Sequence, residues 1–224
     1  MRVLVACEES QRVCIAFREK GHEAYSCDVV ECSGGHPEWH IQADVLPLLN
    51  GHCEFKTMDG GEHYIEKWDL LIAHPPCTYL SNVCTRGFSL KSTPAEKVVE
   101  RWKQRAISVI FFMHMVLAPI EKIAVENPVG FMNCNYKKPT QIIEPYQFAN
   151  DIKDEDYVTK KTCLWLKNLE KLKPNNLPRP NNREKYGIYS NGKAKCWEDF
   201  CVSSAKERSK TFKGVAKAMA EQWG

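Results

Sequence analysis

The chain has 224 residues, of which 43% are hydrophobic and 26% charged. This composition indicates a globular protein with one substantial core and excludes a disordered or fibrous chain. Met1 runs directly into an apolar segment, and the longest apolar run, residues 107–120, is interrupted by His114 and Pro119. We therefore expect no secretory signal, no membrane association and a cytoplasmic location.

The net charge of +3 is unevenly distributed. Residues 157–224 contain 15 Lys and Arg against 6 Asp and Glu, whereas residues 1–156 contain 16 against 22. A basic C-terminal third suits contact with a polyanion such as nucleic acid. From charge alone, a solvated basic surface explains the pattern equally well.

In the first part of the chain, strand-like and helix-like segments alternate. We predict strands at 2–7, 22–30, 39–49, 68–74 and 122–127, and helices at 10–21 and 95–117. Ser10 is placed to cap the first helix and Gly21 to end it. Strands that alternate with helices predict right-handed crossovers, and hence an α/β fold with a doubly wound, mostly parallel sheet.

The second part is less regular. Residues 137–148 predict one helical turn and a connection, residues 157–169 a strand, and residues 173–195, rich in Pro, Asn and Gly, an extended loop. Residues 203–223 end in an amphipathic helix, whose predicted inward-facing residues are Val215, Ala218, Met219 and Trp223.

Eleven cysteines occur in the chain. Without a secretory signal they indicate reduced thiols, not a disulfide framework. One group has the spacing C-x4-C-x3-H-x3-H, with an inner gap shorter than that of structural zinc sites; it comprises Cys27, Cys32, His36 and His40. We interpret these four as core or loop residues and expect no metal, with zinc binding as the less favoured alternative.

Two proline-stiffened loops follow neighbouring predicted strands. The sequence PPC at 75–77 follows one strand, and ENP at 126–128 ends the next. Ligands of open parallel sheets bind at the carboxyl ends of the strands, so Cys77 and Glu126 should meet in one cleft. A thiolate can add to C6 of cytosine while a carboxylic acid supports protonation at N3, which makes C5 reactive toward a methyl donor.

These motifs resemble those of the DNA cytosine-5 methyltransferases, especially the small phage- or prophage-type members. The resemblance implies a Rossmann-like methyltransferase sheet, S-adenosylmethionine as cofactor, a flipped cytosine as target, and duplex or single-stranded DNA as partner. It implies that Cys77 is the nucleophile and that Glu126 binds N3, with Pro76 and Asn127 completing the two motifs. We expect a monomer in a bacterial or phage-infected cell.

The resemblance also implies a cofactor site. The segment VLVACEESQ (3–11) would lead into the first helix, whose N-terminus would bind the cofactor carboxylate. Asp28 would bind the ribose hydroxyls and Asp44 the adenine amino group. Lys213, in the closing motif ERSKTFKGVAKAM, permits a donor with an extra carboxylate as a variant. The complete predicted cofactor set is Ala6, Cys7, Glu8, Ser10, Gln11, Asp28, Val29, Asp44, Val45, Pro75 and Lys213.

The same resemblance implies a reduced recognition segment. Lys160 and Lys161, in TKKTCLWL, resemble the basic motif that touches the target base or its phosphate. Thr78, Arg179 and Arg183 complete the predicted nucleic-acid-binding set. Only about forty residues, roughly 166–205, are available for sequence recognition, too few for a full recognition domain. We therefore predict a catalytic domain of residues 1–156 and 206–224, a basic recognition segment of residues 157–205, and short sequence specificity dominated by phosphate contacts.

The chain departs from the family pattern in four motifs. The first motif lacks its glycines, Thr78 replaces a glutamine, lysines replace the arginines of the basic motif, and Lys213-Gly214 replaces Gly-Asn. Two alternatives stay open. One is an amino-group methyltransferase of cytosine N4 or adenine N6, which would place an aromatic residue where Cys77 stands. The other is a nucleic-acid-binding protein of the same fold without catalytic activity.

Overall fold

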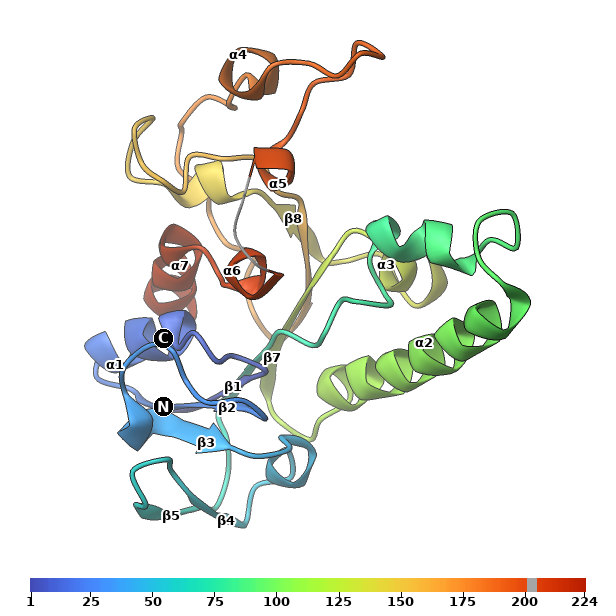
Figure 1. Ribbon diagram of the computed structural model, residues 1–224. Coiled ribbons are helices and arrows are strands. Elements are labelled where there is room, and N and C mark those ends of the chain that lie inside the picture. Colours follow the sequence, from blue (N-terminus) through green and yellow to red (C-terminus); the bar gives the residue numbers. More distant parts are fainter. Residues whose placement is uncertain (201–204) are drawn as a thin grey trace.

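The computed structural model describes residues 1–200 and 205–224. A seven-stranded sheet forms its centre (Figure 1). Its strands in chain order are β1 (Arg2–Ala6), β2 (Glu23–Asp28), β3 (His40–Gln42), β6 (Leu70–Ala73), β7 (Lys122–Pro128), β8 (Gln141–Ile143) and β9 (Thr162–Lys167).

The strands lie in the order β3-β2-β1-β6-β7-β9-β8. The five from β3 to β7 are parallel, whereas β9 runs antiparallel to both β7 and β8. β6 is buried along its whole length, as expected of a central strand covered on both faces. The prediction of an α/β fold with a doubly wound, mostly parallel sheet is therefore confirmed.

Helices cover both faces of this sheet. On one face, α1 (Arg12–Glu19) and α7 (Lys213–Trp223) pack with Val3, Val5 and Leu70. On the other, the long helix α2 (Ala95–Val116) brings its buried Phe112 and Met115 against Leu4 and Leu71. Neighbouring residues of one strand thus contribute to opposite layers, because side chains alternate along a strand.

Shorter elements surround the sheet. β4 (Cys53–Lys56) and β5 (Glu62–Ile65) form a separate antiparallel hairpin. The short α-helices are α3 (Phe131–Asn135), α4 (Asn182–Tyr186), α5 (Trp197–Phe200) and α6 (Ala205–Ser209), and the 3₁₀ helices are η1 (Pro37–Trp39), η2 (Leu46–Leu48), η3 (Asn82–Phe88) and η4 (Pro145–Phe148). Nowhere in residues 1–200 and 205–224 is there a helix apolar and long enough to cross a membrane.

Several local predictions need correction. The third strand is only three residues long, and the 3₁₀ helix η2 begins soon after it, at Leu46. The β4–β5 hairpin was not predicted. Residues 137–148 contain the strand β8 as well as the turn η4, and the loop 173–195 contains α4.

The two ends of α1 and the buried face of α7 test the sequence signals directly. Ser10 does not cap α1: the N-cap residue is Gln11, at φ 58°, and no side chain of the cap residue bonds to the helix. Gly21 does follow the helix end, at φ +81°, a conformation that favours glycine. The four residues of α7 predicted to face inward are all buried.

Met219 tests the packing of α7. Its side chain is 1% exposed within the layer formed with α1, so Met219→Ala should lower the free energy of unfolding by about 2–5 kcal/mol. Lys217→Ala, at an exposed position of the same helix, should change it by less than about 0.5 kcal/mol. Urea denaturation measures both, and equal effects would contradict this packing.

Candidate active site

A cleft lies where the direction of strand winding reverses. β1 leads outward to β2 and β3 on one side, and β6 lies against its other side, so the switch point falls between β1 and β6. The cleft has a volume of about 400 Å³. It is lined by residues that follow β1 (7–10) and β6 (74–77) and by the last residues of β7 (126–128), together with Lys160 and residues 208–211 near the C-terminus.

The loops after β6 and β7 are held together by hydrogen bonds. The Asn127 side-chain amide donates to the Pro75 carbonyl at 2.8 Å, and the Phe131 amide donates to the Leu80 carbonyl at 2.7 Å. Gly130 lies at this contact, and a Cβ atom there would come within 2.1 Å of the Leu80 carbonyl oxygen. The two loops therefore approach closely enough to present Cys77 and Glu126 to one cleft.

Cys77 is an exposed residue, although protein atoms crowd its thiol. This desolvation raises the pKa of Cys77, the negative charge of Glu126 raises it further, and Lys160 lowers it. The positive charge of Lys160 on the cleft wall therefore favours the thiolate, the nucleophilic form of a cysteine.

Glu126 is paired with a histidine. Its Oε2 atom lies 3.2 Å from Nδ1 of His74, and the two side chains are 24% and 8% exposed. Burial alone lowers the pKa of His74, but the hydrogen bond and charge of Glu126, with the charge of Glu8, outweigh burial and raise it. The pair can therefore hold a proton at the end of two adjacent strands.

Glu8 occupies the N-terminus of α1. Its carboxylate accepts hydrogen bonds from the backbone amides of Val13 at 2.6 Å and Cys14 at 3.2 Å. Burial raises the pKa of Glu8 to about 7, while His74 and these two amides oppose the rise. This side chain, not Ser10, supplies the capping oxygens, and it fills the position where the sequence predicted a cofactor carboxylate.

The loop leading into α1 achieves its shape without glycine. Cys7 and Gln11 adopt left-handed conformations, at φ 60° and 58°. Such values are uncommon for residues with a side chain and mark local strain. Gln11 is held there by hydrogen bonds between its side-chain amide and the backbone of His36.

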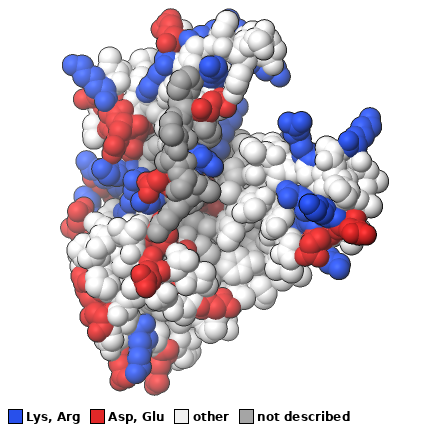
Figure 2. Space-filling model, in the orientation of Figure 1, with Lys and Arg blue, Asp and Glu red and all other residues white. Residues whose placement is uncertain are grey.

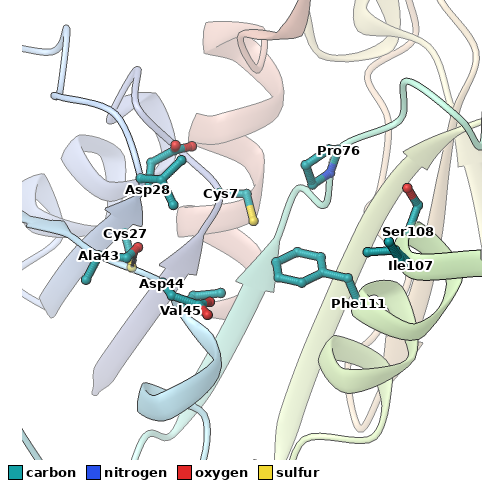
Figure 3. A pocket seen from close by; sticks show the side chains of 11 residues that line it. Cys7, Cys27, Asp28, Ala43, Asp44, Val45, Pro76, Ile107, Ser108 and Phe111 are labelled. Atoms are coloured by element: carbon teal, nitrogen blue, oxygen red, sulfur yellow. Dashed lines mark hydrogen bonds between the residues drawn. The ribbon is translucent and has the colours of Figure 1, made fainter. Parts of the chain in front are cut away.

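A second cavity, of about 290 Å³, adjoins the cleft and shares Cys7, Asp28 and Pro76 with it (Figure 3). The ring of Phe111 points into it from α2, and the ends of β2 and β3 form the opposite wall. The remaining lining residues are Cys27, Val29, Ala43, Asp44, Val45, Ile107 and Ser108. The lining is mainly apolar with two carboxylates, a composition typical of small-molecule sites.

This cavity fits the nucleoside part of S-adenosylmethionine. One oxygen of Asp28 accepts the Val30 amide, and one oxygen of Asp44 accepts the Leu46 amide, which orients both carboxylates. Each retains acceptor capacity for a hydroxyl or an amino group. The helix N-terminus does not fit the cofactor carboxylate in the same way, because Glu8 already occupies it.

The predicted cofactor residues separate into two groups. The residues that line a cavity are Cys7, Glu8, Ser10, Asp28, Val29, Asp44, Val45 and Pro75. Ala6 and Gln11 are buried behind the loop and line neither cavity. Lys213 lies on neither wall, and its ammonium group pairs with Glu155 at 2.9 Å.

Of the predicted nucleic-acid-binding residues, one lines the cleft and the others lie outside it. Lys160 lines the cleft, where its ammonium group donates to the Arg208 carbonyl at 2.7 Å and lies 5.8 Å from the Trp197 ring centre. Thr78 follows Cys77 and is exposed, as is Lys161, but neither lines the cleft. Outside the cleft, Arg179 forms a two-bond ion pair with Glu144, and Arg183 lies on α4.

Other residues of the two cavities were missed. His74 was counted only as part of a strand, and Phe111 only as one apolar residue of a helix. A histidine that ends an otherwise apolar strand immediately before the PPC motif was the one available signal for His74. No comparable signal separates Phe111 from its apolar neighbours.

The Cys27–His40 group has ordinary structural contacts. Cys27 donates to the Ala43 carbonyl, and His40 bonds to the Ser26 hydroxyl and the Val30 carbonyl. His36 stacks on Trp39. Across the part of the chain that the structure describes, no three His, Cys, Asp or Glu side chains are arranged to hold a metal ion.

No protein-family model matches the sequence, and no curated protein matches it. Among solved structures, the chain is similar to a protein provisionally named a DNA modification methyltransferase, encoded within an E. coli prophage. The identity is 12% and the TM-score 0.44. The similarity covers 85% of this chain and 56% of that protein, so this chain spans little more than half its length.

The buried carboxyl group of Glu8 should make stability depend on pH. Because its pKa is raised from 4.5 to about 7, the folded protein retains a proton that the unfolded chain releases, and stability falls as pH rises between these values. Glu8→Gln should remove this pH-dependent loss of folding stability, which is on the order of 2 kcal/mol between pH 4.5 and about 7. Melting temperatures from pH 4.5 to 7.5 measure it.

The matched control is Glu19→Gln, at the exposed last residue of α1. It should leave the pH dependence of the melting temperature unchanged. An identical pH dependence in the wild type and Glu8→Gln would contradict the raised pKa of the buried Glu8 carboxyl group.

Proposed function

We propose that this chain is an S-adenosylmethionine-dependent DNA cytosine-5 methyltransferase, with Cys77 as nucleophile and Glu126 as the acid that binds N3. One observation carries the proposal: Cys77 and Glu126 line one cleft at the switch point, next to a mainly apolar cavity with two carboxylates. A thiol where an amino-group methyltransferase would place an aromatic ring favours carbon over nitrogen as the methylated atom.

The chemistry follows from the two groups. The Cys77 thiol loses its proton to solvent at the cleft mouth, and the thiolate forms a bond to C6 of the cytosine. The electrons of the C5–C6 double bond move to C4–C5, those of the C4–N3 double bond move to N3, and N3 takes a proton from Glu126. C5 thereby becomes an enamine carbon. After methylation, water at the cleft mouth takes the C5 proton as a base, and the C5–H electrons re-form the C5–C6 double bond and expel the Cys77 thiolate. The N3 proton returns to the Glu126 carboxylate.

The chain's own residues would hold the methyl donor beside this reaction. When bound, S-adenosylmethionine supplies a methyl group on a positively charged sulfur. Asp28 and Asp44 are suited to the hydroxyls and amino group of the nucleoside, and the ring of Phe111 to packing against it. Glu8 lines the adjoining cleft, where a carboxylate suits the positive charges of the donor's amino acid part.

DNA would approach over Lys160 and the neighbouring C-terminal segments. On the face seen in Figure 2, Lys and Arg gather over the upper part of the molecule, whereas acidic side chains predominate below. The target base would be flipped into the cleft, since C6 is inaccessible within a duplex. Residues 1–156 and 206–224 would form the catalytic part and residues 157–205 the recognition segment. Thr78 and Lys161 would supply further contacts, and the recognition sequence would be short.

Trapping with 5-fluorocytosine tests the nucleophile. Fluorine cannot leave C5 as a cation, so methyl transfer onto such a base leaves the enzyme attached to DNA. Incubation with S-adenosylmethionine and a mixed-sequence duplex containing 5-fluorocytosine should give a covalent adduct on a denaturing gel. Cys77→Ala should abolish it, because the adduct is a Cys77 thioether.

Cys134→Ala is the matched control, because Cys134 is also exposed but lies on α3 and outside the cleft. It should leave the adduct yield unchanged. Methylation of cytosine N4 or adenine N6 without an adduct would favour the amino-group alternative, and DNA binding without any transfer would favour the inactive binder.

Asp28 tests the cofactor site independently of catalysis. Asp28→Asn should weaken S-adenosylmethionine binding roughly 10- to 100-fold, because hydrogen bonds to charged groups contribute about 1.5–3 kcal/mol. Isothermal titration calorimetry measures this change. Asp151→Asn, at an exposed turn outside both cavities, should bind as the wild type does. Equal affinities for wild type and Asp28→Asn would place the nucleoside elsewhere.

A further inference from the structure

His74 lies between the two strands that carry the proposed chemistry. It directly follows β6, and its backbone amide donates to the Ala6 carbonyl at 2.9 Å, which fixes its position beside β1. Its ring is 8% exposed, with Nδ1 against Glu126 at 3.2 Å. Its ring borders the cleft, and its hydrogen bond to Glu126 is the contact through which it can act on a substrate.

The other ring nitrogen is unusual. Nε2 of His74 is buried and has no hydrogen-bond partner within the described residues, although nearly all buried polar atoms are paired. A bond at the second nitrogen normally fixes the tautomer of a histidine. Since no such bond exists here, the ring can carry a proton on either nitrogen or on both.

Charges from three elements surround the ring. Glu8 lies on the loop after β1, Glu126 on β7, and Lys160 just before β9. The two carboxylates favour a protonated ring, whereas Lys160 and the loss of solvent around the ring oppose it, and the balance raises the pKa of His74. Glu126 alone bonds to the ring directly.

We propose that His74 is a positioning residue that holds Glu126 by a hydrogen bond and stores the proton that Glu126 delivers to the ring nitrogen of a bound pyrimidine. This inference rests on the proposed function. Neither the PPC nor the ENP motif contains this histidine, and its role follows from the Nδ1–Oε2 contact and from the free Nε2 atom.

The proton transfer balances within the pair. Before reaction, the pair holds an imidazolium and a carboxylate. As the Cys77 thiolate adds to C6, Nδ1 gives its proton to Glu126, and the carboxyl group gives a proton to N3. The ring is left neutral, with its remaining proton on Nε2. When the thiolate leaves, the N3–H electrons re-form the C4–N3 double bond and the proton returns to the pair.

His74→Asn separates proton storage from positioning. Asparagine retains an amide donor close to the position of Nδ1 but cannot titrate. The readout is exchange of tritium from C5 of cytosine in DNA, measured without a methyl donor from pH 5 to 9. This exchange requires thiolate addition, N3 protonation, uptake of a solvent proton at C5 and loss of the tritium to water, but no methyl transfer. In the wild type, exchange should fall as rising pH removes the proton that His74 and Glu126 share.

In His74→Asn the remaining proton carrier is a carboxyl group, and carboxyl groups ordinarily titrate near pH 4. The falling limb of the pH profile should therefore move to lower pH, and exchange at pH 7.5 should drop about 100-fold, the scale of general acid catalysis. His114→Asn, at an exposed position near the end of α2, should retain the wild-type profile.

The outcomes are distinguishable. An unshifted falling limb in His74→Asn would overturn proton storage by His74 and leave the methyltransferase proposal intact. Absence of both exchange and 5-fluorocytosine adduct in the wild type would instead overturn the proposed function and this inference with it. Nitrogen-15 NMR of the wild type needs no variant: His74 should be an imidazolium at pH 6.5, and a neutral ring there would also overturn the inference.

Discussion

The in-register pairing of β6 with β7 is the constraint on which the site depends. Their last paired residues are Ala73 and Val125, so His74 and Glu126 come next at the same level of the sheet. The Asn127–Pro75 hydrogen bond continues this alignment into the loops. A shift of one residue would turn either side chain to the other face and separate them, because side chains alternate along a strand. Backbone hydrogen bonds in the core thus fix the distance between these two side chains at the end of the sheet.

Acidic side chains are concentrated at this end of the sheet. Glu8, Asp28 and Glu126 all line the cleft, and Glu9 lies beside them. Under the proposed function, their charges would repel a DNA backbone, and Lys160 with the neighbouring C-terminal segments would provide the attraction. The interior of the cleft would then favour a cationic donor and a protonated base, while the surrounding surface would favour phosphates.

The sequence predicted the elements whose signals are strong and local. β1, β6, β7 and α2 have long apolar runs or helical periodicity, and the order of the PPC and ENP motifs was sufficient to predict that they meet. The β4–β5 hairpin was missed because its strands are four residues long and largely polar. Side-chain partners far apart in sequence could not be predicted, such as Arg179 with Glu144 or Lys213 with Glu155. The sequence suggested a DNA contact for Arg179 and a cofactor contact for Lys213, whereas the structure engages both cations in ion pairs.

The self-capped start of α1 has a consequence for the order of assembly during folding. Glu8 contacts amides only five and six residues further along, so this loop closes at little entropic cost. The His74–Glu126 contact spans 52 residues and requires the central strands to pair first. The loop between β1 and α1 can thus acquire its shape early and without a bound ligand, whereas the His74–Glu126 pair exists only once the central strands have paired. A nascent or damaged chain would keep the first and lack the second.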